Sequence, residues 1–194
     1  MAVDALATSP RRGRFEDLPR RERPLLRDAQ RGSEEALEQL FRLHWGPAHR
    51  AAFLIVRDAA AAEDIAQEAF LAAVRALDRF DRRRPFAPWL HRIVVNRAID
   101  FARARAIRRE VGVAAEFDPV GPSDAPSRPY SDDTAAALAK LSVEHRAVIV
   151  MRYLLEYTPG EIARALGLPR GTVNSRLRRG LDRLALELGQ EASP

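Results

Sequence analysis

The chain has 194 residues, of which 46% are apolar and 30% charged, a balance that is ordinary for a globular protein with one or two cores. It has no cysteine, which excludes disulfides, thiol redox sensing and cysteine-ligated zinc. The net charge of +5 favours an acidic partner such as nucleic acid, although the arginine bias also fits a GC-rich genome. No apolar run approaches the ~18 residues of a membrane span, so we expect a cytoplasmic protein without membrane insertion.

The N-terminal residues 1–28 carry seven arginines and five acidic residues. Proline stands at positions 10, 19 and 24, which interrupts any helical periodicity. We expect a disordered arm here, either dispensable or regulatory.

Residues 29–110 show helical periodicity without strand alternation and predict a helical domain. Ser33 is expected to cap one helix, and a further helix is expected from about Pro47 to Val56. The next helix follows Asp58 and places apolar residues on one side. Its polar side carries Glu63, Asp64, Gln67 and Glu68. Such a cluster is usually solvated, and the alternative is a partner surface.

The charge changes sign abruptly after this helix, because residues 82–109 contain nine arginines and one acid, Asp100. A basic loop leads into a long predicted helix in which aromatic residues stand among the arginines. Bases of single-stranded nucleic acid stack on such rings while arginines hold the phosphates. The alternative is that Trp89 and the other large apolar residues belong to the core.

Residues 111–133 contain one arginine, five acidic residues and four prolines. This composition predicts a flexible, acidic, proline-rich linker. Residues 134–194 are expected to form a second domain of four short helices.

The last two of these helices predict a helix-turn-helix over residues 158–188. Thr158 and Glu161 form a capping box, and Gly167 is suited to the left-handed turn that ends the first helix. The second helix has one apolar stripe: Val173, Leu177, Leu181, Leu184 and Leu188. Its opposite face is polar and rich in arginine, which suits the major groove of DNA; the alternative is a solvated helical hairpin.

These motifs, in this order, resemble the extracytoplasmic-function group of bacterial sigma factors over about residues 30–188. The resemblance rests on Ala-Glu-Asp-Ile-Ala-Gln-Glu-Ala-Phe at 62–70, on the segment 86–105 with Trp89 and Asn96, and on the helix-turn-helix. It implies an all-α fold of two small domains, with core RNA polymerase and promoter DNA as partners and an anti-sigma factor as regulator. The linker then resembles the segment that threads toward the polymerase active site, although a plain spacer stays open.

The resemblance also implies a role for each surface. The polymerase-binding residues are Asp64, Gln67 and Glu68. The residues that bind the minus-ten element are Arg84, Phe86, Trp89, Arg92, Asn96 and Arg103. The residues that bind the minus-thirty-five element are Arg170, Thr172, Asn174, Ser175, Arg176, Arg178 and Arg179.

Two departures from the family pattern leave details open. Asn174 stands where many relatives have Lys or Arg, and Asn prefers adenine edges whereas Arg prefers guanine, so the promoter preference is open. The glycine usual before the helix-turn-helix is missing from residues 154–157, so the loop geometry is open as well.

An enzyme is not expected, because the sequence has no glycine-rich phosphate loop and its histidines are not at ligand spacing. We therefore predict no catalytic residue, no cofactor and no metal site. The alternative from another class is a dimeric helix-turn-helix repressor that reads a palindrome without polymerase. Such a repressor does not require the second nucleic-acid-like surface at residues 82–109.

Overall fold

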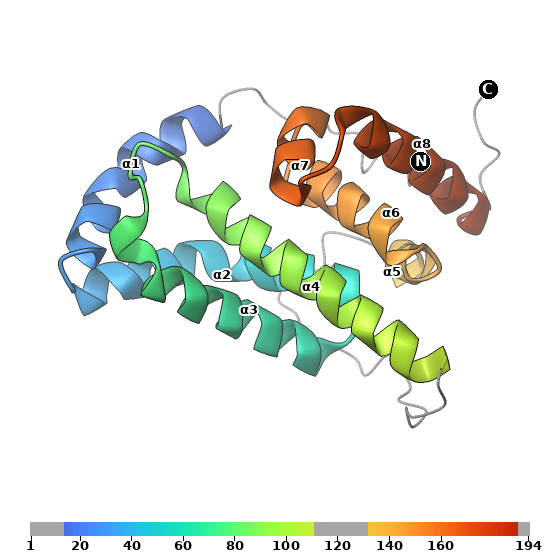
Figure 1. The fold of residues 1–194 in the computed structure, drawn as a ribbon, viewed down its shortest axis with the longest axis horizontal. Coiled ribbons are helices and arrows are strands. Elements are labelled where there is room, and N and C mark those ends of the chain that lie inside the picture. The colour runs from blue at the N-terminus through green and yellow to red at the C-terminus, as the bar shows by residue number, and fades with distance from the viewer. Residues whose placement is uncertain (1–13, 111–131, 190–194) are drawn as a thin grey trace.

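The computed structural model describes residues 14–110 and 132–189, and the regular elements in these ranges are all helical (Figure 1). The first domain comprises α1 (Arg14–Ala29), α2 (Glu34–Val56), α3 (Ala59–Arg75), the 3-10 turn η1 (Leu77–Arg79) and α4 (Phe86–Glu110). The second comprises α5 (Asp132–Ala139), α6 (Val143–Ile149), the π-helical turn η2 (Val150–Leu154), α7 (Pro159–Leu166) and α8 (Arg170–Glu187). The predicted all-α fold with two helical domains is confirmed. Most of the predicted linker lies outside the described residues.

Two helices of the first domain begin where the sequence predicts, one after the cap Ser33 and one after Asp58. Ser33 Oγ accepts a hydrogen bond from Ala36 N at 3.2 Å, where α2 begins. Asp58 Oδ1 accepts from Ala61 N at 3.0 Å, where α3 begins. Each cap satisfies a backbone N–H that the helix itself leaves unpaired, and this fixes where the helix starts.

Helix α1 corrects the prediction for the N-terminus. The predicted disordered arm is wrong for residues 14–28, which belong to α1, whereas residues 1–13 lie outside the described part of the chain. Leu26 is 1% exposed, and Glu22 Oε1 lies 3.3 Å from His44 Nε2 of α2 with both side chains buried. Gln30 Nε2, just after α1, donates to Leu77 O at 2.8 Å and to Phe80 O at 3.0 Å. Tertiary packing therefore outweighs the tendency of proline to break the helix.

The separate helix predicted from Pro47 is also wrong, because α2 continues through Pro47 to Val56. A proline inside a helix removes one backbone hydrogen bond. Leu40, on one side of the proline, and Ala48 and Ala51, on the other, are all buried. A continuous buried face compensates for the lost bond.

The helix-turn-helix of the second domain has the predicted local structure. Thr158 Oγ1 accepts from Glu161 N, and Glu161 Oε2 accepts from Thr158 N at 2.8 Å, so the capping box is present. Gly167 ends α7 in the left-handed conformation with φ 66°. Along α8, Val173, Leu177 and Leu184 of the predicted apolar stripe are buried. The turn chemistry in the sequence therefore sets the geometry of the motif.

The loop before α7 contains a left-handed backbone conformation at a residue that is not glycine, since Glu156 has φ 61°. Glutamate therefore supplies the conformation that glycine usually supplies there, at some cost in steric strain. Gly180 in α8 has a different reason to be glycine. A Cβ added to it would lie 2.9 Å from Ile149 Cδ1 of α6, so the close approach of α6 and α8 requires its absence.

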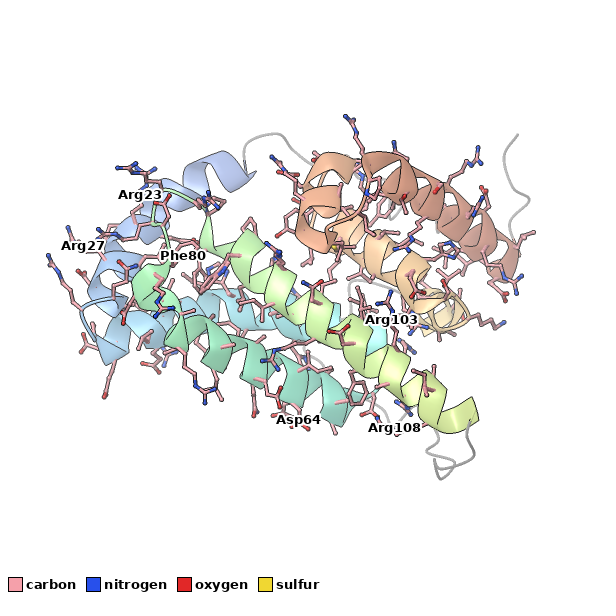
Figure 2. All side chains as sticks on the ribbon, in the orientation of Figure 1. Arg23, Arg27, Asp64, Phe80, Arg103 and Arg108 are labelled. Atoms are coloured by element: carbon pink, nitrogen blue, oxygen red, sulfur yellow. The ribbon has the colours of Figure 1, made fainter. Side chains whose placement is uncertain are left out.

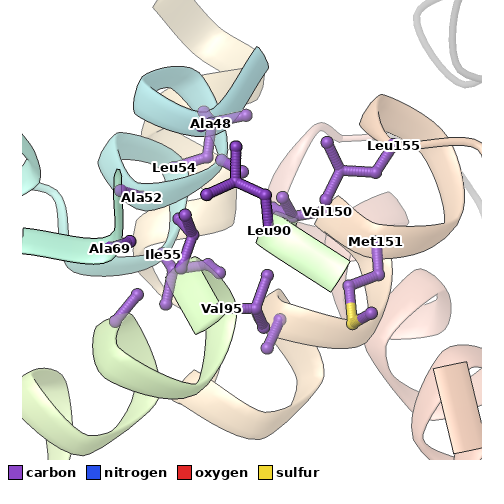
Figure 3. Packing of buried hydrophobic residues seen from close by; sticks show 14 of the residues in the cluster. Ala48, Ala52, Leu54, Ile55, Ala69, Leu90, Val95, Val150, Met151 and Leu155 are labelled. Carbon is purple, nitrogen blue, oxygen red and sulfur yellow. The ribbon is translucent and has the colours of Figure 1, made fainter. Parts of the chain in front are cut away.

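The two domains pack against each other through one continuous apolar core. Helix α4 contacts α2 and α3 on one side and α6 and α7 of the second domain on the other. Figure 3 shows Ile55 and Leu90 of the first domain in the same cluster as Val150, Met151 and Leu155 of the second. None of the helices in the described ranges is long and apolar enough to cross a membrane.

We expect Leu26→Ala to lower the free energy of unfolding by about 2–5 kcal/mol, because it leaves a cavity between α1 and α2. Urea denaturation of the full-length protein measures this change. Leu43→Ala is the matched control, since Leu43 is 56% exposed and its loss should change stability by less than about 0.5 kcal/mol. Equal stability of both variants would mean that α1 does not belong to the core.

Candidate nucleic-acid interface

An acidic surface lies on the exposed side of α3. Asp64, Gln67 and Glu68 are all exposed there, and Figure 2 shows Asp64 at the edge of the molecule. Gln67 Nε2 donates to Glu63 Oε1 at 3.2 Å, and Glu68 forms an ion pair with Arg97 of α4. The fold therefore brings the three predicted residues together on one accessible face. The ion pair with Arg97 orients the side chain of Glu68.

A second surface follows one face of α4. At about 100° per residue, Trp89, Arg92, Asn96 and Arg103 fall within an arc of roughly 60°. Arg92 and Arg103 are exposed, while Trp89 and Asn96 are half-buried. Arg84 precedes the helix in an exposed loop and lies 4.0 Å from Asp81. Four of the six predicted minus-ten residues thus form one stripe, and a fifth extends it into the loop.

Phe86 does not belong to this accessible stripe. It is 3% exposed and packs edge-on against Phe80, with ring centroids 5.8 Å apart. A ring inside the core cannot stack on a base in this conformation, so the role predicted for Phe86 is corrected to a structural one. Trp89 keeps part of its surface in solvent while its ring packs on Phe80 at 4.7 Å.

The third surface is the outward face of α8. Arg170, Asn174, Arg178 and Arg179 are exposed, whereas Thr172, Ser175 and Arg176 are half-buried. Ser175 Oγ donates to Thr172 O at 2.9 Å, so its hydroxyl is already engaged with the helix backbone. Nevertheless all seven predicted residues lie in the first three turns of one helix, where a helix-turn-helix approaches DNA.

One carboxylate links the second and third surfaces. Glu144 of α6 accepts from Arg103 Nε at 3.0 Å and from Arg103 Nη2 at 2.9 Å. Burial tends to raise the pKa of Glu144, but its backbone hydrogen bond, Arg103 and the nearby charge of Arg176 together lower it below the usual range. Glu144 is therefore charged at neutral pH, and the interaction weakens as the pH falls through this lowered pKa.

A buried hydrogen bond closes the contact between the domains at α4. His91 Nδ1 lies 3.0 Å from Tyr157 Oη, which comes from the loop before α7, and both residues are 4% exposed. Burial, and to a lesser extent His44, lowers the pKa of His91 to about 3, while burial raises the pKa of the Tyr157 phenol. Both groups are consequently neutral at physiological pH.

Sequence reasoning missed these contacts between the domains. His91 is isolated in the sequence, and Glu144 is an ordinary residue of a first helical turn. Arg146, which donates to Ile55 O of α2 at 2.6 Å, does have a signal in the sequence, because this cation directly precedes the apolar run 147–151. In the described residues no group of three or more histidine and acidic side chains could hold a metal ion.

Comparison with known proteins identifies two family models along the chain. Sigma-70 region 2 matches residues 40–108, and Sigma-70 region 4 matches residues 131–184. The chain is 38% identical to the ECF RNA polymerase sigma factor SigM of Mycobacterium tuberculosis, over 81% of this chain and 80% of that protein. It is 31% identical to the ECF RNA polymerase sigma factor SigW of Bacillus subtilis, over 84% of this chain and 94% of that protein.

Two solved structures share the fold. CnrH in complex with the cytosolic domain of CnrY matches with a TM-score of 0.64 and 31% identity, over 87% of this chain and 97% of that chain. The sigma factor RpoE in complex with the anti-sigma factor NepR from Bartonella quintana matches with a TM-score of 0.64 and 25% identity, over 78% of this chain and 96% of that chain. The two matched regions correspond to the two domains that carry the three surfaces.

We expect Glu144→Gln to strengthen binding of the full-length protein to duplex DNA, by up to about fivefold, because Arg103 loses a paired carboxylate and an exposed ion pair contributes about 0–1 kcal/mol. Fluorescence anisotropy with a random-sequence duplex measures the affinity. The control is Glu38→Gln, which removes the same charge from an ion pair with Arg42 that is remote from α8. Equal gains in both variants would reflect net charge alone.

Proposed function

Because the chain belongs to the extracytoplasmic-function sigma factors, we propose that it binds core RNA polymerase, recognises a promoter and promotes strand opening at the start of transcription. The observation that carries this proposal is the presence, in one chain, of an acidic face on α3, a basic stripe on α4 and a helix-turn-helix. The chain works in the cytoplasm, where polymerase and promoters are. It contributes no catalytic group, because the polymerase performs the chemistry.

The acidic face serves core polymerase. Asp64, Gln67 and Glu68 are exposed on one side of α3, where a partner reaches all three. The ion pair with Arg97 holds Glu68 in place and leaves the rest of the face to the partner. Charge complementarity of this kind speeds association and discriminates between partners.

The basic stripe of α4 receives the minus-ten element. Arg84, Trp89, Arg92, Asn96 and Arg103 supply cations, a half-exposed ring and an amide along one face. Cations track the phosphates of a single strand, and the ring and amide offer stacking and hydrogen bonds to unpaired bases. Capture of an unstacked base offsets the few kcal/mol that unstacking costs.

The outward face of α8 reads the minus-thirty-five element in the major groove. The exposed side chains of Asn174, Arg178 and Arg179 reach base edges, while Arg170 and Arg176 lie nearer the phosphates. Thr172 and Ser175 are half-buried and support the surface from its margin. Loss of a base-contacting arginine relaxes specificity at one position, whereas loss of a phosphate contact weakens binding to all sequences alike.

Control is assigned to an anti-sigma factor. In the closed arrangement Glu144 already occupies Arg103, and α4 is covered by α6 and α7. A partner that favours this arrangement keeps Arg103 paired with Glu144 and so withholds that donor from DNA. Of the two similar solved structures, RpoE is bound to the anti-sigma factor NepR and CnrH is bound to the cytosolic domain of CnrY, which supports this assignment.

A run-off transcription assay with and without core polymerase tests the function. We expect transcripts only when this protein and core polymerase are both present. We also expect Asp64→Arg to abolish co-purification with core enzyme, because a reversed charge repels the basic partner surface. Glu35→Arg, an equal reversal at an exposed site on α2, is the control. Normal co-purification of the Asp64 variant contradicts the polymerase assignment, and duplex binding without any transcript favours a dimeric repressor.

Strand opening is tested separately with Asn96→Ala. We expect this variant to assemble with polymerase and to bind duplex DNA normally, yet to form less open complex, since the amide contacts only the unpaired strand. Permanganate footprinting on a cognate promoter measures the unpaired thymines. Wild-type reactivity in the variant removes Asn96 from the strand-binding face.

A further inference from the structure

A basic hollow lies at the end of the first domain remote from α5 and α8. Its volume is about 330 Å³, and it is lined by Arg23, Pro24, Arg27, Arg82 and Arg83. The first three residues come from α1, and the last two come from the loop between η1 and α4. Figure 2 shows Arg23 and Arg27 on α1 in this region, with Phe80 at the start of the loop beside them. Segments about 60 residues apart in the sequence therefore build one concave surface.

The charges in the hollow are only partly neutralised. All four arginines are exposed. Arg27 Nε lies 3.2 Å from Asp28 Oδ1, and no ion pair within the described chain engages Arg23, Arg82 or Arg83. The four guanidinium groups, of which only that of Arg27 is in an ion pair with a described residue, repel each other, and an anion placed among them relieves this repulsion.

The two walls are held in place by buried contacts. Gln30 Nε2 bridges from the end of α1 to the carbonyls of Leu77 and Phe80, at 2.8 and 3.0 Å. The buried contact between Glu22 and His44 fixes α1 on α2. Arg23 and Arg27 are one helical turn apart, so both project from the same face of α1. The hollow is thus prearranged, which lowers the entropy lost when an anion binds.

The loop itself is also ordered by its own hydrogen bonds. Arg83 N donates to Asp81 Oδ1 at 3.0 Å, and Arg84 N donates to Asp81 O at 2.9 Å. This turn presents the side chains of Arg82 and Arg83 toward α1 and continues directly into α4. The loop therefore connects the hollow to the Trp89 end of the proposed strand-binding stripe.

We propose that this hollow binds the phosphodiester backbone of the opened promoter strand, so that α1 extends the strand-binding surface beyond α4. The inference rests on the proposed function. Each guanidinium group can donate two parallel N–H hydrogen bonds to the oxygens of one phosphate. The ring of Pro24 offers an apolar surface to the adjoining sugar. The site reads no sequence, because phosphate contacts fix position and register only.

Binding of a fluorescein-labelled oligothymidylate to the full-length protein, followed by anisotropy over a range of salt concentrations, tests the proposal. We expect Arg23→Gln with Arg27→Gln to weaken binding roughly ten- to thirtyfold near 0.1 M salt. The slope of the logarithm of the binding constant against the logarithm of the salt concentration should become shallower by about 1.4, since each phosphate contact on a single strand contributes about 0.7 to that slope. Arg82→Gln with Arg83→Gln, on the opposite wall, should act alike.

The matched control is Arg31→Gln with Arg42→Gln, which removes the same charge from exposed positions outside the hollow. Thermal unfolding of each variant shows that the fold is intact. The proposal would be overturned if the wild-type protein did not bind the oligothymidylate, or if the variants of the hollow and the control variant weakened this binding equally. Pyrophosphate that binds the wild type without displacing the oligothymidylate would overturn it too, because the hollow would then be a free-anion site.

The outcome is distinguishable from failure of the proposed function. Run-off transcription by the wild-type protein with core polymerase tests that function without reference to the hollow. Transcripts together with unchanged oligothymidylate binding by the pocket variants would remove the hollow alone. Absent transcripts together with weakened binding would remove the sigma function and leave a single-strand site.

Discussion

A buried guanidinium joins the two domains, and their closed arrangement depends on it. Arg146 donates to Ile55 O of α2 at 2.6 Å, and to Ala139 O and Leu141 O of its own domain at 3.1 and 2.9 Å. Burial, and then the charge of Arg57, lowers the pKa of Arg146 to about 10, so the group stays charged at neutral pH. Carbonyl dipoles replace its water, and because these bonds need exact positions, the domains meet in one register and do not slide.

The contact between the two domains explains the unusual distribution of residues along α4. A helix at the surface of a domain has one apolar stripe, but α4 packs on α2 and α3 and also against α6 and α7. Leu90 and Val94, on one side of the helix, and Val95, about 100° further around the axis, are all fully buried. What remains for solvent is the narrow stripe that contains Arg92 and Asn96. The proposed DNA-binding face is therefore the part of α4 that neither packing layer uses.

Local chemistry could be predicted from the sequence, and long-range packing could not. The caps at Ser33, Asp58 and Thr158 depend on residues three positions away, so the sequence contains all the information they need. Helix α1 depends on burial of Leu26 against α2, and the long α2 depends on a buried face on both sides of a proline. Likewise the aromatic pattern of α4 does not distinguish Phe86, which is in the core, from Trp89, which is at its edge.

The charges at the domain contact set a competition that links opening to DNA binding. Arg103 cannot pair with Glu144 and with a phosphate through the same donors, so each DNA contact made there costs one contact between the domains. Any partner that separates α6 from α4 raises the DNA affinity by the free energy of the lost contact, and DNA favours separation by the same amount. Exposed ion pairs contribute only about 0–1 kcal/mol, so this linkage is weak at Arg103 alone. The buried bonds of His91 and Arg146 do not compete with DNA and stabilise the closed arrangement, so a DNA contact at Arg103 shifts the equilibrium between closed and open molecules only slightly.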